Sequence, residues 1–337
     1  MKEMKPLLDV RGLTVELPTA QGWVRPVNEV SLRVGAGECL GLVGESGSGK
    51  TMLSLALMGL LPTGARVRGE AWLEGRTGAG SGALRNVLQL SDEEMRELRG
   101  REMAMIFQEP MTSLNPVMRV GAQVEEVIRA HYPKMAAELV REKMLEALRW
   151  AAVPEVEERA RQYPHQLSGG LRQRLMIAMA IVAGLAEPTL VQARLLIADE
   201  PTTALDVTVQ KEILELLRKL RSELGLGLLF ITHDLGVVAQ VADRVAVMYA
   251  GRMVEEGPVK EVLEVPRHPY TQGLLAASPK LERGKLTPIP GSVPKLTALP
   301  PGCAFEPRCR FRRYECGVAV PELRTANADH VARCVLV

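Results

Sequence analysis

The segment Gly44–Thr51 constrains the fold more than any other part of the chain. Its residues GESGSGKT fit the pattern G-x-x-x-x-G-K-[ST], in which glycines let backbone N–H groups turn inward around an anion. A buried strand is expected at Cys39–Val43, and an apolar helix is expected at Thr51–Leu61, ended by Pro62 and Gly64. Strand, glycine-rich turn and helix in this order predict an α/β fold that binds phosphate at a helix N-terminus.

Every position of this loop is a candidate nucleotide contact. Lys50 is expected to neutralise β- and γ-phosphate oxygens, and the Thr51 hydroxyl is expected to ligate Mg²⁺. A glycine-rich surface turn is the structural alternative, and the loop alone does not separate ATPases, GTPases and kinases. The candidate contacts are Gly44, Glu45, Ser46, Gly47, Ser48, Gly49, Lys50 and Thr51.

Two carboxylates end a second apolar strand. The strand is expected at Leu195–Ala198, and Asp199 and Glu200 follow it at the edge where ligands bind in open α/β sheets. Asp199 is suited to hold Mg²⁺ directly or through water, and Glu200 is suited to polarise an attacking water. The alternative is a helix cap, although Pro201 and the buried strand argue against a cap alone.

Two weaker candidates lie near other expected strands. His233 follows the strand Leu228–Thr232 and is placed to hydrogen-bond a γ-phosphate, although a structural histidine is the alternative for such a residue taken alone. Gln108 lies where the sheet meets a helical insertion, so it is a candidate sensor of γ-phosphate or Mg²⁺. A single glutamine carries almost no information by itself.

The rest of the chain alternates strands and helices. The first 35 residues predict antiparallel strands, a capping box predicts a helix beginning near Ser91, and residues 90–180 are expected to be mostly helical. Strand–helix–strand alternation later in the chain predicts a parallel sheet. The remaining expected elements are a helix at Val207–Leu224, a hairpin formed by Val245–Met248 and Met253–Glu256, and a proline-rich linker at Gly284–Gly302.

Composition limits the classes of partner. The net charge of +2 over 337 residues gives no indication of a basic nucleic-acid-binding face, so no nucleic-acid partner is expected. The N-terminal residues lack the apolar stretch of a signal peptide. The longest apolar runs, Leu55–Leu61 and Leu175–Ala183, fall short of the ~20 residues of a spanning helix. We therefore expect a soluble, cytoplasmic chain whose membrane association goes through a partner.

The run Leu167-Ser168-Gly169-Gly170 opens a further apolar helix, expected at Leu171–Gly184. Together with the loop and the strand ends, it resembles the nucleotide-binding domain of ABC-type ATPases over residues 6–260. The resemblance assigns Walker A to 44–51, the Q-loop to Gln108, the signature to 167–171, Walker B to 195–200, the D-loop to 203–206 and the switch histidine to His233.

The resemblance implies a P-loop NTPase fold with a parallel-sheet core, an antiparallel β subdomain and a helical subdomain at about 90–180. It implies that ATP lies between the P-loop of one subunit and the signature of another, with Ser168 and Gly170 donating to the γ-phosphate. The implied catalytic residues are Glu200, His233, Lys50 and Gln108. The implied Mg²⁺ ligands are Thr51, Gln108 and Asp199, and further nucleotide contacts come from Gly169 and Asp206.

Three segments resemble the oligopeptide/dipeptide branch of bacterial ABC importers: 105–116, 198–208 and 268–271. This implies an ATPase subunit on the cytoplasmic face of the inner membrane, paired with a similar but non-identical ATPase. Two membrane permeases and an extracytoplasmic solute-binding protein complete the implied assembly. A nickel or glutathione importer is the alternative; a non-transport ABC ATPase usually carries a long coiled coil or tandem cassettes, and this chain has neither.

The resemblance leaves three questions open, two about segments and one about a tryptophan. Met111–Pro116 is where permease coupling helices are expected to dock, the alternative being an ordered loop after the Q-loop. Ala186–Arg194 is longer than expected and reads as a surface insertion. No adenine-stacking aromatic is obvious, and Trp23 is as consistent with simple packing as with stacking.

Four of the five cysteines lie near the C-terminus with the spacing C-x5-C-x6-C-x17-C, whereas Cys39 reads as a core residue. A reducing cytoplasm argues against disulfides, and a segment with little apolar core favours a metal staple of zinc or [4Fe–4S] type. The spacing resembles cluster-bearing importer tails, which favours iron–sulfur over zinc or free thiols. The cluster residues are Cys303, Cys309, Cys316 and Cys334, and the expected domains are 6–260, a helical segment with linker at 261–302, and an extension at 303–337.

Overall fold

The computed structural model describes residues 6–75, 83–109, 113–186, 194–278, 287–327 and 329–337. The chain forms two compact units. Unit 1 contains Met1–Leu7, Gly35–Glu38 and Leu90–Leu229, and unit 2 contains Leu8–Val34, Cys39–Gln89 and Phe230–Val337. The boundary falls inside strand β8 (Gly227–Thr232).

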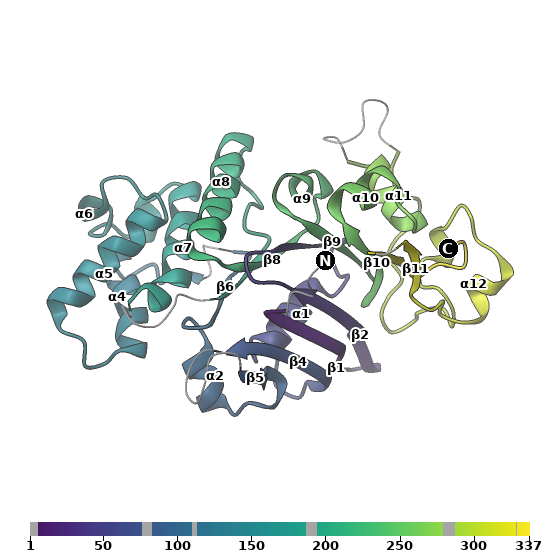
Figure 1. Ribbon diagram of the computed structural model, residues 1–337, viewed down its shortest axis with the longest axis horizontal. Coiled ribbons are helices and arrows are strands. Elements are labelled where there is room, and N and C mark those ends of the chain that lie inside the picture. The colour runs from purple at the N-terminus through teal and green to yellow at the C-terminus, as the bar shows by residue number, and fades with distance from the viewer. Residues whose placement is uncertain (1–5, 76–82, 110–112, 187–193, 279–286, 328) are drawn as a thin grey trace. The chain divides into compact units, whose positions relative to one another are not determined.

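Unit 2 begins with an antiparallel sheet in the order β2-β1-β4-β5 (Figure 1). Its β1–β2 pair confirms the antiparallel strands predicted for the first 35 residues. Its strands are β1 (Leu8–Thr19), β2 (Gly22–Val34), β4 (Arg66–Gly75) and β5 (Ala83–Asn86). Apolar residues at alternate positions are buried, and helix α1 (Lys50–Leu57) contacts β1 and β2. The sheet thereby covers the helix that follows the glycine-rich loop.

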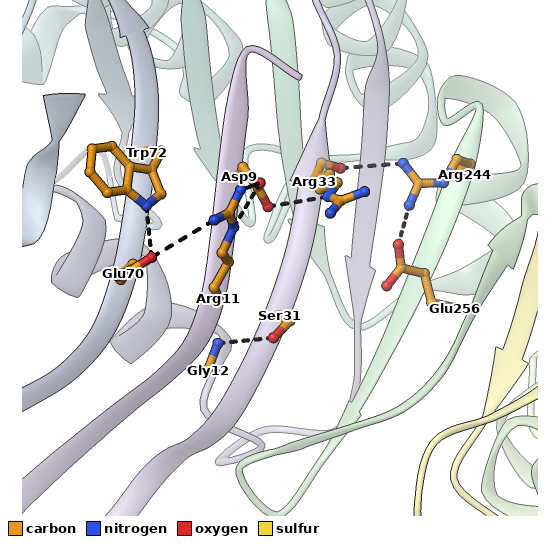
Figure 2. Close-up of polar contacts among 9 residues, drawn as sticks. All are labelled: Asp9, Arg11, Gly12, Ser31, Arg33, Glu70, Trp72, Arg244 and Glu256. Carbon is orange, nitrogen blue, oxygen red and sulfur yellow. Dashed lines mark hydrogen bonds and ion pairs between the residues drawn. The ribbon is translucent and has the colours of Figure 1, made fainter. Parts of the chain in front are cut away.

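A buried carboxylate on β1 is held by arginines of the same sheet (Figure 2). Asp9 is 5% exposed and accepts hydrogen bonds from Arg11 at 2.7 Å and from Arg33 at 3.2 Å. Arg244 of β9 donates to the Arg33 carbonyl at 3.3 Å and pairs with Glu256 of β10. The buried charge of Asp9 is thus paired. Through Arg33 and Arg244, the same contacts connect the antiparallel sheet to the second sheet of unit 2.

The second sheet of unit 2 carries the order β11-β12-β10-β9-β3. Strand β3 pairs in parallel with β9, and β9 and β10 form the predicted hairpin, with Tyr249 opposite Arg252. The C-terminal residues extend this sheet, since β12 pairs with β10 and β11 pairs with β12. The strands are β3 (Cys39–Val43), β9 (Arg244–Tyr249), β10 (Arg252–Pro258), β11 (Arg324–Asn327) and β12 (His330–Ala332).

Unit 2 also contains short helices, which follow β8 and β10 along the chain. They are α9 (Leu235–Val241), α10 (Val259–Glu264), α11 (Pro269–Ala276) and α12 (Tyr314–Val318). The described part of the expected linker, 287–302, forms neither helix nor strand. The division into 6–260, 261–302 and 303–337 stays a prediction, but β12 places part of the expected extension in the same sheet as the phosphate-loop strand.

Unit 1 combines a parallel strand pair with packed helices. Strand β6 (Met103–Ile106) pairs with β7 (Leu195–Asp199), which confirms a parallel pair and places one strand inside the mostly helical stretch 90–180. Helices α4, α5 and α7 pack on one another (Figure 1). Among the residues of this unit that the structure describes, the α-helices include α2 (Asp92–Leu98), α4 (Val120–His131), α5 (Ala137–Trp150), α6 (Val156–Arg159), α7 (Gly169–Leu185) and α8 (Val207–Leu224).

Of two predicted helix boundaries, one is confirmed and one is wrong. The capping box at Ser91 is present, with Ser91 Oγ accepting from the Glu94 N–H. The predicted end of the helix after the glycine-rich loop, at Leu61, was wrong: α1 ends at Leu57. Gly59 adopts a φ of 61°, and the N–H groups of Gly59 and Leu60 bond back to Ala56 and Leu55. This glycine cap ends the helix before Pro62 is reached.

Within the described ranges, no helix has both the length and the apolar character to cross a membrane. The insertion expected at Ala186–Arg194 falls largely at 187–193, outside the described residues.

Candidate functional site

The loop between β3 and α1 needs glycine at two positions for steric reasons. A Cβ on Gly44 would lie 2.2 Å from the Met248 carbonyl oxygen. A Cβ on Gly49 would lie 1.9 Å from the Pro26 carbonyl oxygen, and the φ of Gly49 is 104°. Gly47 has a φ of 79° in open space, so there the backbone conformation alone favours glycine. The loop is therefore wedged between β2 and β9 and keeps a conformation that other residues cannot adopt.

Lys50 is folded back across this loop. Its side chain is almost fully buried, and Nζ donates to the carbonyl oxygens of Gly44 at 2.7 Å and Glu45 at 3.1 Å, and to Ser48 Oγ at 3.3 Å. Ser46, Gly47 and Thr51 are exposed to solvent. A buried ammonium beside an exposed turn at a helix N-terminus is suited to an anionic ligand.

Glu45, the second loop residue, is held by side chains from distant parts of unit 2. Its carboxylate accepts from Arg308 Nη1 at 2.7 Å and Nη2 at 3.1 Å, and its N–H donates to the Tyr270 hydroxyl at 2.8 Å. Burial raises the pKa of Tyr270, so the hydroxyl is neutral. Sequence reasoning assigned no role to Arg308, because 263 residues separate it from Glu45 and no local pattern connects them.

His233 follows β8 directly and is exposed. The next residue, Asp234, caps α9 by accepting from the N–H groups of Gly236 at 2.8 Å and Val237 at 3.3 Å. The cap fixes the backbone beside His233 and leaves its ring at the carboxyl end of a strand. That position suits a side chain that contacts a ligand.

In unit 1, the structure brings together two of the predicted catalytic side chains. Glu200 follows β7 with a φ of 47°, and its Oε2 accepts from Gln108 Nε2 at 3.4 Å and Thr203 Oγ1 at 2.8 Å. Gln108 is two residues beyond β6, whose Ile106 pairs with Ala198. Asp199 ends β7 and is 1% exposed. The parallel strands β6 and β7 therefore place Gln108, Glu200 and the buried Asp199 at the same edge of their pair, at the carboxyl ends of both strands.

The signature run forms the start of α7. Ser168 is the N-cap and its Oγ accepts from the Leu171 N–H at 3.3 Å, while Ser168 and Gly169 are exposed. A Cβ on Gly170 would lie 2.7 Å from Val209 Cγ1 of α8, so glycine allows these helices to pack closely. Asp206 caps α8, accepting from the N–H groups of Thr208 and Val209. An exposed helix N-terminus with a hydroxyl cap is a ready anion site.

Comparison with known families identifies the protein family in which this phosphate loop and these strand ends occur together. Residues 27–203 match the family model described as ABC transporter, over a span that contains the phosphate loop, Gln108, the signature and Glu200. The chain belongs to the ABC transporter family. Residues 254–316 of this ABC ATPase also match the model described as oligopeptide/dipeptide transporter, C-terminal region.

Relatives of this ABC ATPase share nearly its full length. It is 49% identical to a putative peptide import ATP-binding protein of Brucella ovis, over 98% of this chain and 97% of the relative. It is 45% identical to the oligopeptide transport ATP-binding protein OppD of Haemophilus influenzae, over 99% and 98%. The solved dimer of the ATP-binding cassette MJ0796 bound to ADP and Pi is 28% identical and covers 75% of this chain and 98% of its own, with a TM-score of 0.62.

Trp23, the candidate adenine-stacking residue, is 46% exposed on β2. The Arg66 guanidinium lies 3.9 Å from its ring centroid. One ring face is therefore already used in a cation–π contact, as the packing interpretation expects. The role of this tryptophan toward adenine stays a prediction.

The four C-terminal cysteines of the ABC ATPase line one small cavity, together with Phe305. Burial raises the pKa of Cys303 to about 11, and it also raises the pKa values of Cys309 and Cys334. Across the described ranges, which include all five cysteines, no cysteine forms a disulfide, and no three His, Cys, Asp or Glu side chains are arranged to hold a metal ion as they stand. The donors fit a Cys₄ group in type and location, but they do not form a coordination sphere.

Proposed function

We propose that this chain is the ATP-hydrolysing subunit of a bacterial importer of di- and oligopeptides. The observation that carries the proposal is the near-full-length likeness to relatives named for peptide import, together with the match of residues 254–316 to the oligopeptide/dipeptide C-terminal region. In the proposed assembly the chain lies on the cytoplasmic face of the inner membrane. It pairs there with a similar, non-identical ATPase beneath two permeases, which an extracytoplasmic solute-binding protein supplies with cargo.

The proposed chemistry begins with binding of ATP at the glycine-rich loop. Backbone N–H groups of residues 44–51 surround the phosphates, and Lys50 exchanges its carbonyl partners for phosphate oxygens. Thr51, Asp199 and Gln108 would hold Mg²⁺, which supplies charge neutralisation at the β- and γ-phosphates. Support comes from the exposure of Thr51 and from the placement of Gln108 and Asp199 at the ends of paired strands.

Glu200 is the proposed general base. It would orient and polarise the water that attacks the γ-phosphate, and His233 would hydrogen-bond the same phosphate. The hydrogen bonds that Glu200 accepts from Gln108 and Thr203 support this role, because they orient the carboxylate at the strand end. Gln108, the proposed sensor of γ-phosphate, is thus hydrogen-bonded to the side chain that would activate water.

The signature would serve the nucleotide of a partner ATPase. Ser168, Gly169 and Gly170 lie at the exposed N-terminus of α7, where a 17-residue helix contributes positive partial charge to a partner's γ-phosphate. Asp206, at the neighbouring N-terminus of α8, would contact the same interface. The solved cassette with ADP and Pi is described as dimeric, which supports pairing as the working state. Closure would then depend on the γ-phosphate and be released by hydrolysis.

The extension is proposed to hold a [4Fe–4S] cluster on Cys303, Cys309, Cys316 and Cys334, with zinc as the alternative. Four thiols around one cavity support a Cys₄ site, and a bound metal would stabilise the thiolates that burial disfavours. The proposed role is that of a structural staple. Anaerobic purification should give a brown protein with about four iron atoms per chain, whereas a colourless protein with stoichiometric zinc would contradict the cluster.

Permease docking is proposed at Met111–Pro116 and the helices that follow. Residues 110–112 lie outside the described ranges, so support comes from the adjoining loop. Leu114 is buried, and the Asn115 N–H donates to Gln123 Oε1 at 3.0 Å, while Val117 is 80% exposed. An anchored loop that presents an apolar side chain suits a coupling helix as partner.

The substitution Glu200→Gln tests the proposed chemistry. It keeps the shape and the hydrogen-bond acceptor but removes the base, so ATP binding should change less than about threefold while turnover falls at least 100-fold. Glu215→Gln is the matched control, because it makes the same chemical change at an exposed position of α8. Equal turnover in the two variants would contradict the role of Glu200.

A further inference from the structure

Arg308 is a buried cation that the proposed chemistry does not use. It ends the short helical turn Glu306–Arg308 of the C-terminal extension, and its side chain is only 4% exposed. Besides its two bonds to Glu45, it donates to the Pro290 carbonyl at 2.9 Å and to the Tyr249 hydroxyl at 3.3 Å. Burial of a guanidinium is costly unless its donors are satisfied, and here the partners are arranged around it.

The contacts converge on one residue of the phosphate loop. The carboxylate of Glu45 binds Arg308, its N–H binds Tyr270, and its carbonyl oxygen accepts from Lys50. Side chain and both backbone polar groups are thus fixed at the point where β3 passes into the loop. Arg308 therefore holds the residue whose carbonyl oxygen accepts a hydrogen bond from Lys50.

Aromatic packing makes the arrangement rigid. Tyr249 of β9, Tyr270 of α11 and Phe305 of the extension are each at most 3% exposed. Their ring centroids lie 4.5 Å apart for Tyr249 and Tyr270, 5.3 Å for Tyr249 and Phe305, and 5.4 Å for Tyr270 and Phe305. These rings hold the backbone that carries Arg308 and the hydroxyl that binds Glu45.

A second buried contact fixes the segment before Tyr270. Glu255 of β10 is fully buried and accepts from the N–H groups of Arg267 at 2.6 Å and His268 at 2.9 Å. Its Oε1 also lies 2.7 Å from His330 Nε2, on strand β12 of the extension. The extension therefore reaches the loop by two routes, directly through Arg308 and indirectly through Glu255 and α11.

The pairing of Glu45 with Arg308 also affects the electrostatic potential at the phosphate loop. Glu45 places a carboxylate on a loop whose proposed ligand is a polyanion, so an unpaired Glu45 would repel the phosphates. A bidentate arginine neutralises that charge and fixes the carboxylate at two points. Lysine would supply the charge without the two-point geometry.

We propose that Arg308 is a positioning residue of the phosphate loop, through which the C-terminal extension sets the affinity of the loop for nucleoside triphosphate. The inference rests on the proposed binding of ATP at Gly44–Thr51. It makes the extension part of the nucleotide site. Cys303 and Cys309 flank the segment that carries Phe305 and Arg308, so residues that line the cysteine cavity also hold Arg308 in place.

Isothermal titration of the full chain with Mg²⁺ and AMP-PNP tests the proposal. Arg308→Gln should raise the Kd about tenfold, because Glu45 is left as an unpaired negative charge on the loop. Glu45→Gln alone should raise the Kd no more than about threefold. The double variant should bind like Glu45→Gln, so that removal of the carboxylate rescues the loss of the arginine.

Arg310→Gln is the matched control, since Arg310 lies two residues away in the extension and bonds Gln272 rather than the loop. It should leave the Kd unchanged. Wild-type affinity in Arg308→Gln, or no rescue in the double variant, would overturn the positioning role. Loss of binding in the wild-type chain would instead contradict the proposed function, so the two failures are distinguishable.

Discussion

The substitution Gly49→Ala should damage the phosphate loop far more than backbone strain alone predicts. Alanine at a φ of 104° costs about 1–2 kcal/mol for its left-handed conformation. Its Cβ would also lie 1.9 Å from the Pro26 carbonyl oxygen, well inside contact distance, so the loop or β2 must move by more than about 1 Å. We expect a total loss of roughly 3–5 kcal/mol and no measurable ATP binding.

Gly12→Ala separates strain from collision. Gly12 has a φ of 56° and no atom within 4 Å of the position of its Cβ, so this variant carries the strain without the clash. In differential scanning calorimetry, the Tm should fall by about 2–4 °C for Gly12→Ala and by more than about 6 °C for Gly49→Ala. Equal shifts with ATP binding retained in both variants would refute the steric argument.

Three further predictions concern other residues. Burial lowers the pKa of His268 to about 3, below its unfolded value, so its contribution to stability is complete above pH 6.5 and falls as the pH drops toward 3. His268→Asn removes this titration but keeps an acceptor for the Tyr270 N–H. In urea titrations, the free energy of unfolding should therefore fall by about 2 kcal/mol less in the variant than in the wild type between pH 7 and pH 5. With the pKa of Cys303 raised to about 11, iodoacetamide should modify this thiol in metal-free protein at pH 8 on the order of 100-fold more slowly than free cysteine, and a rate like that of free cysteine would contradict its burial. Asp206→Ala removes an N-cap with two bonds and should cost about 1 kcal/mol in thermal unfolding, whereas Glu215→Ala on the same helix should cost less than half of that.

Local signals in the sequence predicted much of the fold. Alternation placed β1 and β2, the helix Val207–Leu224 matches α8, and the hairpin around Ala250 was confirmed. These predictions succeeded because burial of one face imposes the period of the element on its residues. The predicted end of α1 is wrong because Pro62 is the stronger stop signal in the sequence, whereas in the structure Gly59 already caps the helix.

The candidate site was predictable wherever one motif carries the chemistry. The loop glycines, Lys50, Glu200 and Ser168 each lie in a local sequence motif, so sequence order is enough to name them as candidates. The contact of Gln108 with Glu200 depends on the pairing of β6 and β7. Arg308 was invisible in the sequence because its partner is 263 residues away and only the tertiary fold joins them.

Reconstitution tests the central claim, that this chain powers peptide import. The chain would be assembled in liposomes with its co-encoded permeases, partner ATPase and solute-binding protein, and ATP hydrolysis and uptake would be measured together. We predict that di- or oligopeptides stimulate both, and that Glu200→Gln abolishes both. Hydrolysis and uptake that respond to nickel or glutathione, but not to peptides, would contradict the account.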